Sequence, residues 1–364
     1  MKNIAIVTFN KAHNYGAVLQ AYALKVKLDS LGHSTKFYNY DPRWINEHYS
    51  FFPVVKNENL FKNIKRKAGY IIDIKRRYTR YKGFNDFINN NLPIWSNDEL
   101  KSIDCLVIGS DQVWNPKITC GFDAECFGVI ENISKANVVS YAASMEGLSL
   151  DNPEKIEFSR LIKNFDHVGV RESSLKTYLE ELDPNMIVNH NLDPTLLLNS
   201  NDWLKLVENE GVSSNYEDDY VLVYENYKTG LTSQIAQQVA DKYNLKVRTI
   251  TTGASWRHGK DIETEVSPTE FVSLFSDAKF VITTSYHGLA FSINFGVQFV
   301  CLKVKGGVNN RALSLLNVLN LEDNIYDAET FDINSYKHVN YEGVNKKLNE
   351  QRVISTKFLS DSIG

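Results

Sequence analysis

The stretch "NIAIVTFNKAHNYGAVLQAYALKVKLDSLG", Asn3–Gly32, contains the unit that repeats along this chain. Its first seven residues form the apolar run that is typical of a buried strand. After a short polar loop, apolar residues recur with the spacing of one helix face: Leu19, Tyr22, Ala23, Val26 and Leu31. Gly32 is a typical residue at the end of a helix. The stretch therefore predicts a strand followed by a helix.

The same alternation of strand and helix patterns continues through most of the 364 residues. Further strands are predicted at 34–40, 104–110, 137–144, 167–170, 186–189, 220–225, 245–251, 279–283 and 297–304. Strands that alternate with helices form mostly parallel sheets with both faces covered. A chain of this length usually exceeds one core. We therefore predict an α/β protein with two doubly wound, Rossmann-like domains that face a cleft.

A polar segment divides the chain. The predicted parts are an N-terminal domain at 1–207, a linker at 208–219, a C-terminal domain at 220–335 and a helix at 336–364. The last helix has enough apolar positions to pack back across both domains. Ligands of doubly wound sheets bind at the carboxyl ends of the strands, and each motif described below follows a predicted strand.

Composition restricts the classes of partner and compartment. A formal net charge of −4 gives no general attraction to nucleic acid, so no nucleic-acid partner is expected. The four cysteines show no metal-ligand spacing and favour a reducing cytoplasm, so no metal site is predicted. The chain opens as a strand rather than a signal peptide, and polar residues interrupt its longest apolar region, Phe280–Leu302. We expect a soluble, cytoplasmic protein.

Two loops of the N-terminal domain carry candidate binding residues. In "TFNKAHNYGAVLQ", Gly16 lies at a helix start, where backbone amides attract anions; the alternative is a turn glycine with Asn14 as helix cap. In "LVIGSDQVWNP", Asp111, Gln112 and Trp114 follow a buried strand. Carboxylate, amide and indole groups together suit a sugar, and Asp111 could take a proton from a hydroxyl. The alternative is an Asp turn with Trp114 in the core.

Cationic residues follow other strands. Arg171 in "VGVRESS" could bind a phosphate or carboxylate with two parallel hydrogen bonds, or could form a surface ion pair. In "KVKGGVNNRALSLL", Lys303 and Arg311 lie near paired glycines and could form an anion pocket or a solvated loop.

The segment "ITTSYHGLAFSINFG", Ile282–Gly296, changes from strand to helix at a single histidine, His287. A histidine with a pKa near ~6.5 can give or take a proton at neutral pH. The alternative is a capping or core histidine held by hydrogen bonds.

The basic segment, Lys62–Lys82, holds nine cationic residues against one acid, Asp73, with three interleaved tyrosines. A solvated helix would explain this composition. Attraction to an anionic membrane surface that carries a lipid-linked substrate is the functional alternative.

Taken together, these stretches resemble the polysaccharide pyruvyl transferase family. The matching pieces include "NYGAVLQAYAL", "GSDQVWN", "VRESS", "SPTEFVSLFSDAKFVITTSYHGLAFSINFGVQFV" and "NNRALSLLNVLNL", and they span roughly residues 3 to 320. The resemblance implies two Rossmann-like domains in a GT-B-type arrangement. It also implies transfer of pyruvate from phosphoenolpyruvate onto two hydroxyls of one sugar, which makes a cyclic ketal and releases phosphate.

The resemblance implies that His287 and Arg171 take part in donor binding or catalysis. With the residue types of each motif added, we predict His287 and Asp111 as the catalytic residues. Donor binding falls to Arg171, Ser285, Tyr286, Lys303, Asn310 and Arg311. Acceptor binding, on the N-terminal side, falls to Asn14, Tyr15, Gly16, Gln112, Trp114 and Asn115. The implied partners are phosphoenolpyruvate as co-substrate and a sugar acceptor, expected to be a lipid-linked oligosaccharide of a surface polysaccharide. No cofactor is implied.

The chain departs from the family at one position of this motif. Better-studied members carry arginine two positions before the histidine, where this chain has Ser285. Lys303, Arg311 or Arg257 would then have to hold the donor anion. Two alternatives therefore stay open: a GT-B glycosyltransferase that uses a nucleotide sugar, and a sugar-binding relative without catalysis.

Overall fold

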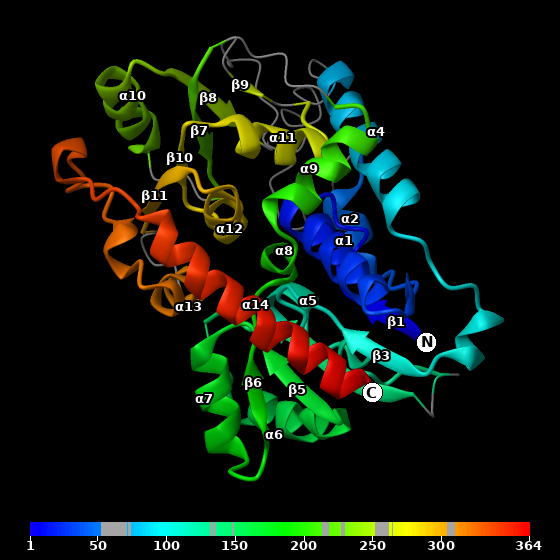
Figure 1. Cartoon of the computed structure of the whole chain (residues 1–364). Helices are drawn as coiled ribbons and strands as arrows, with labels where there is room; N and C mark the ends of the chain where they lie inside the picture. The colour runs from blue at the N-terminus through cyan, green and yellow to red at the C-terminus, as the bar shows by residue number, and fades with distance from the viewer. Residues whose placement is uncertain are drawn as a thin grey trace, which may run out of the picture.

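A computed structural model shows two parallel six-stranded sheets with helices around them (Figure 1). The predicted α/β class with two doubly wound units is therefore confirmed. The structure describes residues 1–51, 71, 74–131, 133, 136–147, 149–212, 218–226, 230–251, 262–263, 265–303 and 310–364.

The first sheet defines the N-terminal unit and has the strand order β2-β1-β3-β4-β5-β6. Its strands are β1 (Asn3–Val7), β2 (Ser34–Phe37), β3 (Cys105–Ile108), β4 (Asn137–Ala143), β5 (His167–Val170) and β6 (Val188–His190). All neighbouring pairs are parallel. The sequence of β3, "CLVI", is buried at all four residues, as expected for a strand covered on both faces.

Helices of different lengths connect these strands. The helices of this half are α1 (Tyr15–Ser30), α2 (Arg43–Tyr49), α4 (Ile74–Asn91), α5 (Pro116–Thr119), α6 (Asn152–Leu161) and α7 (Ser173–Leu182). Local sequence fixes several helix starts, since Asn14 caps α1 and Asp151 forms a capping box with Glu154 at α6. Single 3-10 turns occur at Glu99–Ser102, Ala124–Phe127 and Ile162–Asn164.

The second sheet defines the C-terminal unit, with the order β12-β11-β10-β7-β8-β9. Its strands are β7 (Tyr220–Tyr224), β8 (Lys246–Ile250), β9 (Ile262–Glu263), β10 (Phe280–Thr283), β11 (Gln298–Leu302) and β12 (Ile325–Tyr326). Its helices are α10 (Thr232–Tyr243), α11 (Pro268–Asp277), α12 (Tyr286–Phe295) and α13 (Asn310–Leu319), with 3-10 turns at Glu322–Asn324 and Ile333–Ser335.

Three further helices connect the units. α8 (Pro194–Leu197) and α9 (Ser200–Asn209) lie between the two sheets in sequence, and α14 (Tyr341–Ile363) ends the chain. Figure 1 shows α14 crossing from the C-terminal unit to the strands of the N-terminal unit. On α14, Arg352 donates to Asn294 of α12 and Ser355 accepts from the amide of Leu192. The last helix therefore packs across both units, as predicted. The division of the chain at 208–219 stays a prediction.

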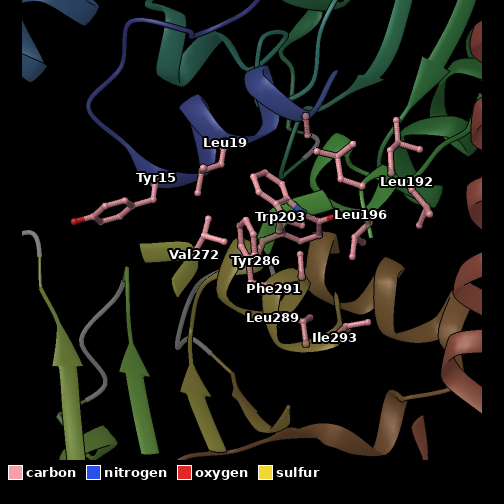
Figure 2. Close-up of a cluster of buried hydrophobic side chains, with 14 of the residues drawn as sticks. Tyr15, Leu19, Leu192, Leu196, Trp203, Val272, Tyr286, Leu289, Phe291 and Ile293 are labelled. Carbon is pink, nitrogen blue, oxygen red and sulfur yellow. The ribbon is translucent and has the colours of Figure 1, made fainter. Parts of the chain in front are cut away.

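The two units share one continuous apolar core. Trp203 of α9 lies between α1 and α12, with ring centroids 5.8 Å from Tyr22 and 5.0 Å from Phe291 (Figure 2). Leu19 of α1 and Leu196 of α8 belong to the same buried cluster. A joint apolar core of this kind resists relative motion of the units better than a polar interface does. Within the part of the chain that the structure describes, no helix is both long and apolar enough to cross a bilayer.

Candidate functional site

Each sheet has one switch point in its strand order. In the N-terminal unit the order reverses between β1 and β3, and in the C-terminal unit it reverses between β7 and β10. Ligands of doubly wound sheets bind beyond the carboxyl ends of strands at such points. α1 follows β1 and α12 follows β10. The first turns of these two helices meet, and most of the predicted site residues lie around that meeting point.

Gly16 and His287 form the direct contact between these two helix starts. A Cβ atom at Gly16 would lie 2.0 Å from Nδ1 of His287, so no larger residue fits there without movement of the ring. His287 itself is only 6% exposed. An imidazole of the C-terminal unit therefore rests on the first turn of α1, and Gly16 is a contact glycine rather than a turn glycine.

Asp193 joins His287 to the N-terminal unit. Its Oδ2 lies 3.7 Å from Nε2 of His287, and the same oxygen accepts from Arg171 at 2.7 Å. Its Oδ1 accepts from the amide and hydroxyl of Thr195, so Asp193 also caps α8. Burial alone would raise the pKa of this carboxyl, but His287, Arg171 and the Thr195 amide together hold it well below its usual range. Asp193 is therefore a buried carboxylate that faces two predicted site residues, His287 and Arg171.

Arg171 is the centre of a buried charge network. Its Nε lies 3.4 Å from Oε1 of Glu172, and its Nη2 lies 3.9 Å from Oδ1 of Asp111. Burial works against its charge, yet Asp193, Glu172 and Asp111 raise its pKa further above the usual value. Its side chain is 1% exposed, which excludes the surface ion pair. Nη2 has no hydrogen-bond partner among the described residues and remains available on the side of Asp111.

Two guanidinium groups lie over the ring of Tyr286. The carbon Cζ of Arg171 is 4.8 Å from its ring centroid and that of Arg311 is 5.8 Å away. Arg311 also pairs with Glu146 of the N-terminal unit at 2.5 Å. Cations over an aromatic face are attracted by the ring quadrupole. The sequence-predicted donor residues Arg171, Tyr286 and Arg311 are thus brought together from β5, α12 and α13.

Asp111 keeps an unusual backbone. Its φ angle is +81°, a left-handed conformation that non-glycine residues rarely adopt and that often marks functional positions. Its Oδ1 accepts from the amide of Gln112 at 2.9 Å. Both side chains are partly exposed, whereas Asn115 is buried, caps α5 and donates to Gln112. In this loop, Asp111 and Gln112 are the predicted site residues with accessible side chains.

Two predicted acceptor contacts are wrong. Trp114 is fully buried, and its indole N–H donates to the carbonyl of Cys126 at 3.0 Å, so its ring offers no face to a sugar. Tyr15 is 1% exposed, stacks on Phe271 with centroids 4.5 Å apart and donates its hydroxyl to the carbonyl of Val266. Both aromatic rings pack inside the protein and are not available to a ligand.

The other predicted residues have varied environments. Asn14 caps α1, and Ser285 caps α12 while it accepts from the amide of Asn226 at 3.1 Å. Lys303 is exposed at the end of β11, and Asn310 begins α13 with a partly exposed side chain. No contact joins Lys303 to the Arg171 network within the described ranges. Arg257 and the paired glycines before Asn310 lie outside the described residues.

Sequence reasoning missed one cation of this region. Arg80 of α4 donates to the carbonyl of His13 at 3.2 Å, and its Cζ lies 5.6 Å from the ring centroid of Tyr15. Burial and Asp111 raise the pKa of Tyr49 to about 12, while Asn14 and Arg80 oppose the shift, so Arg80 and Asp111 both act electrostatically on Tyr49. The sequence had suggested Arg80 only as part of the basic segment, but the structure directs it inward, over the loop between β1 and α1.

The buried carboxyl group of Glu172 also escaped the sequence argument. Its Oε1 accepts from the hydroxyl of Ser144 at 2.5 Å, and burial raises its pKa against the opposing effect of Arg171 and Ser144. Glu172 directly follows Arg171 in the sequence, but the sequence does not show that the side chain of Glu172 is buried. Across the described residues, no cluster of three or more His, Cys, Asp or Glu side chains could hold a metal ion.

Comparisons with known proteins identify a family and a fold. A family model described as polysaccharide pyruvyl transferase matches residues 14–306. A UDP-GlcNAc 2-epimerase from Methanocaldococcus jannaschii has a similar structure over 96% of this chain and 92% of its own, with a TM-score of 0.50 and 13% identity. The corresponding epimerase from Neisseria meningitidis, solved with UDP-GlcNAc, matches over 98% and 94%, with a TM-score of 0.50 and 11% identity. At these identities the likeness shows a GT-B-like fold alone. Comparison with curated sequences gave no significant match.

Proposed function

Because the chain belongs to the polysaccharide pyruvyl transferase family, we propose that it moves pyruvate from phosphoenolpyruvate onto two hydroxyls of one sugar. The sugar would belong to a surface-polysaccharide precursor. The product would be a cyclic ketal, with phosphate released. One observation carries the proposal: a histidine of one unit meets an Asp–Arg pair of the other unit where two helix starts converge.

The reaction needs two proton transfers. A proton adds to the methylene carbon of the donor and makes a methyl group, which leaves positive character at the central carbon. One hydroxyl of the sugar adds there, the bond to the phosphate oxygen breaks, and the second hydroxyl closes the ring. The two hydroxyl protons balance the new methyl proton and the proton on the released phosphate. One acid and one base suffice, so the proposal includes no cofactor besides the co-substrate.

His287 and Asp111 suit these two roles. His287 can donate the proton to the methylene carbon, with Asp193 3.7 Å away to stabilise the charged imidazolium before transfer. Asp111 has an accessible carboxylate on the other side of Arg171 and can accept a hydroxyl proton. His287 reaches Asp193 from the C-terminal unit, and Asp111 lies beside Arg171 in the N-terminal unit, which would allow one to face the donor and the other the acceptor.

The donor carries a carboxylate and a phosphate, so it needs cations. The Nη2 of Arg171 has no hydrogen-bond partner among the described residues and lies 3.9 Å from Asp111, and Arg311 lies over the ring of Tyr286. However, four carboxyl groups surround these two arginines: Asp111, Glu146, Glu172 and Asp193. Since Ser285 supplies no charge, a third cation is required. Arg80 is our candidate for this cation, because it donates to the carbonyl of His13 in the loop between β1 and α1 and, like Asp111, acts electrostatically on Tyr49.

The decisive test is product formation. Purified protein with phosphoenolpyruvate and lipid-linked or soluble sugar acceptors should release phosphate and produce a new methyl resonance of a ketal in proton NMR. The variant Arg171→Lys keeps the charge but loses the planar fork, so donor affinity should fall while the apparent acceptor affinity stays close to wild type.

The same assay separates the alternatives. Sugar transfer from a nucleotide sugar, with no phosphate release from phosphoenolpyruvate, would support a glycosyltransferase instead. Thermal stabilisation by sugar alone, with no turnover of either donor, would support a binding protein without catalysis.

A further inference from the structure

One face of α4 exposes large apolar side chains to solvent. Ile74 is 46% exposed and Tyr78 is 58% exposed, and both lie on the same helix face as Lys75 and Lys82. Ile71, three positions before Ile74, is also helical and is 64% exposed. Positions that are three, four, seven or eight residues apart share one side of an α-helix. These residues, Ile71, Ile74, Lys75, Tyr78 and Lys82, form what we name the outer face of α4.

The opposite side of the helix is occupied by the protein. Phe84 and Phe87 are buried there, and Arg80 donates to the carbonyl of His13. Arg77 of the same side donates to the carbonyl of Phe51. The helix is therefore held by its inner side, and its outer face is not needed for packing within the described residues. Soluble proteins seldom leave several large apolar side chains together on one exposed face without an interaction partner.

Charge indicates the kind of partner. Lys75 and Lys82 lie beside the apolar residues, and Lys82 also pairs with Asp86 at 2.6 Å. The sequence from Lys62 to Lys82 holds nine cationic residues and one acidic residue, within a protein whose net charge is −4. This segment is therefore positively charged, whereas the net charge of the whole chain is negative. A surface that offers both negative charge and an apolar layer complements it.

We propose that the outer face of α4 docks on an anionic lipid surface. Apolar and aromatic side chains would enter the boundary between headgroups and acyl chains, while the lysines would remain at the level of the anionic headgroups. A nucleic acid could pair with the lysines, but it has no apolar layer in which Ile71 and Ile74 could be buried. An acidic protein is a poorer match, because the outer face of α4 is one narrow side of a helix, whereas a stable protein partner needs a broader interface.

The position of α4 would bring the candidate site close to the docked lipid surface. Figure 1 shows α4 at the periphery of the molecule, beside α9 and α11. Its inner side covers the loop between β1 and α1 through Arg80 and Phe84, which lies 5.2 Å from His13 between ring centroids. A helix with its side chains is about 10 Å across, so docking would bring this loop close to the lipid surface. Delivery of a lipid-linked sugar to the site rests on the proposed function; the docking itself does not.

Vesicle co-sedimentation of the full chain tests the docking. The probes are vesicles of phosphatidylcholine with phosphatidylglycerol and vesicles of phosphatidylcholine alone, at low ionic strength. Wild type should bind the anionic vesicles and lose binding as salt is added. Lys75→Gln with Lys82→Gln should weaken binding by about fivefold for each lysine. Ile74→Ser with Tyr78→Ser should weaken it by about tenfold or more.

Matched variants on α14 control for general effects. Lys357 pairs with Asp361 four residues later, as Lys82 does with Asp86, so Lys346→Gln with Lys357→Gln is the control for charge. Val353 is 68% exposed and Ile354 is 51% exposed, so Val353→Ser with Ile354→Ser is the control for apolar surface. Both control variants should bind vesicles like wild type.

Several outcomes would overturn the docking proposal. These are no binding to anionic vesicles, equal binding to neutral vesicles, or equal losses in the control variants. Binding of a DNA duplex that depends on the lysines, with vesicle binding unaffected by Ile74→Ser and Tyr78→Ser, would make the face a general polyanion site. Ketal formation on a soluble acceptor reports the proposed function separately, so either conclusion can fail without the other.

Discussion

Gly16 and His287 touch across the boundary of the two α/β units, with room for a glycine and for nothing larger. A Cβ atom built on Gly16 would lie within 2.0–2.6 Å of three atoms of the imidazole ring. This contact orients the ring between the first turn of α1 and the carboxylate of Asp193. Replacement of Gly16 or of His287 can therefore change the stability of the protein and its turnover separately.

Gly16→Ala is expected to displace the imidazole. Overpacking at a buried contact typically costs about 1–3 kcal/mol of unfolding free energy, and displacement of a catalytic group by about 1 Å can lower turnover by ~10²-fold. Denaturant unfolding and phosphate release would measure the two effects. Gly343→Ala is the control, because the site on α14 has open space, and it should leave turnover unchanged. Wild-type turnover in Gly16→Ala would show that the contact does not position the ring.

His287→Gln should fold but react slowly. Glutamine can keep polar contacts near Asp193 but cannot move a proton as imidazole does. Loss of a general acid–base group typically costs ~10²–10⁴-fold in turnover. The measurement is phosphate release with donor and acceptor present, next to a melting curve. Near wild-type turnover in a folded variant would make His287 structural and remove the proposed mechanism.

Glu172→Gln should change how stability depends on pH. Burial raises the folded-state pKa of Glu172, so this carboxyl binds more protons in the folded state than in the unfolded state. Its contribution to stability is therefore fully present below about pH 4.3, the unfolded value, and is lost as the pH rises toward the folded pKa. Glu172→Gln should remove this decline.

Denaturant unfolding over a pH series would measure the effect as a difference between the variant and wild type. Glu180→Gln is the control, because Glu180 lies on the surface of α7, where it pairs with Lys176. An identical pH slope in Glu172→Gln and wild type would show that the carboxyl is already ionised in the folded protein.

Arg80→Gln is expected to weaken donor binding. A lost hydrogen bond to a charged group costs about 1.5–3 kcal/mol, which corresponds to roughly tenfold or more in affinity. Calorimetric titration with phosphoenolpyruvate would measure it, and Arg76→Gln, one turn away with Glu265 at 3.8 Å, is the matched control. Recovery of affinity by Ser285→Arg in the Arg80→Gln background would place both cations at the same ligand. Unchanged affinity would leave Arg80 as a packing residue of α4.

Trp114→Phe should affect stability and spare acceptor binding. The variant leaves the buried carbonyl of Cys126 without its indole donor, which costs about 1–3 kcal/mol. The apparent affinity for the sugar acceptor should stay at the wild-type value, because the ring does not reach the surface. A selective loss of acceptor affinity at unchanged stability would contradict the structure here.

Much of the fold could be predicted because it is local in the sequence. The long strands are mostly apolar runs, and several helices have a periodic apolar face with a cap, as α11 has with Ser267; α1 is capped by Asn14 and is apolar on most sides. The short strands β9 and β12 and the short helix α8 were not predicted. Two to four residues carry too little periodicity to be recognised, and tertiary contacts alone define these elements.

The sequence by itself determined which chemical groups follow which strands: Asp111 after β3, Arg171 after β5 and His287 after β10. Tertiary structure decided which of these groups meet and which are hidden. Asp193 and Arg80 came to the site from distant segments, while Trp114 and Tyr15 turned into the core. The physical reason is burial. The type of residue sets what chemistry a side chain can offer, but desolvation and close partners, which only the packed chain supplies, set its charge, its orientation and its access to a ligand.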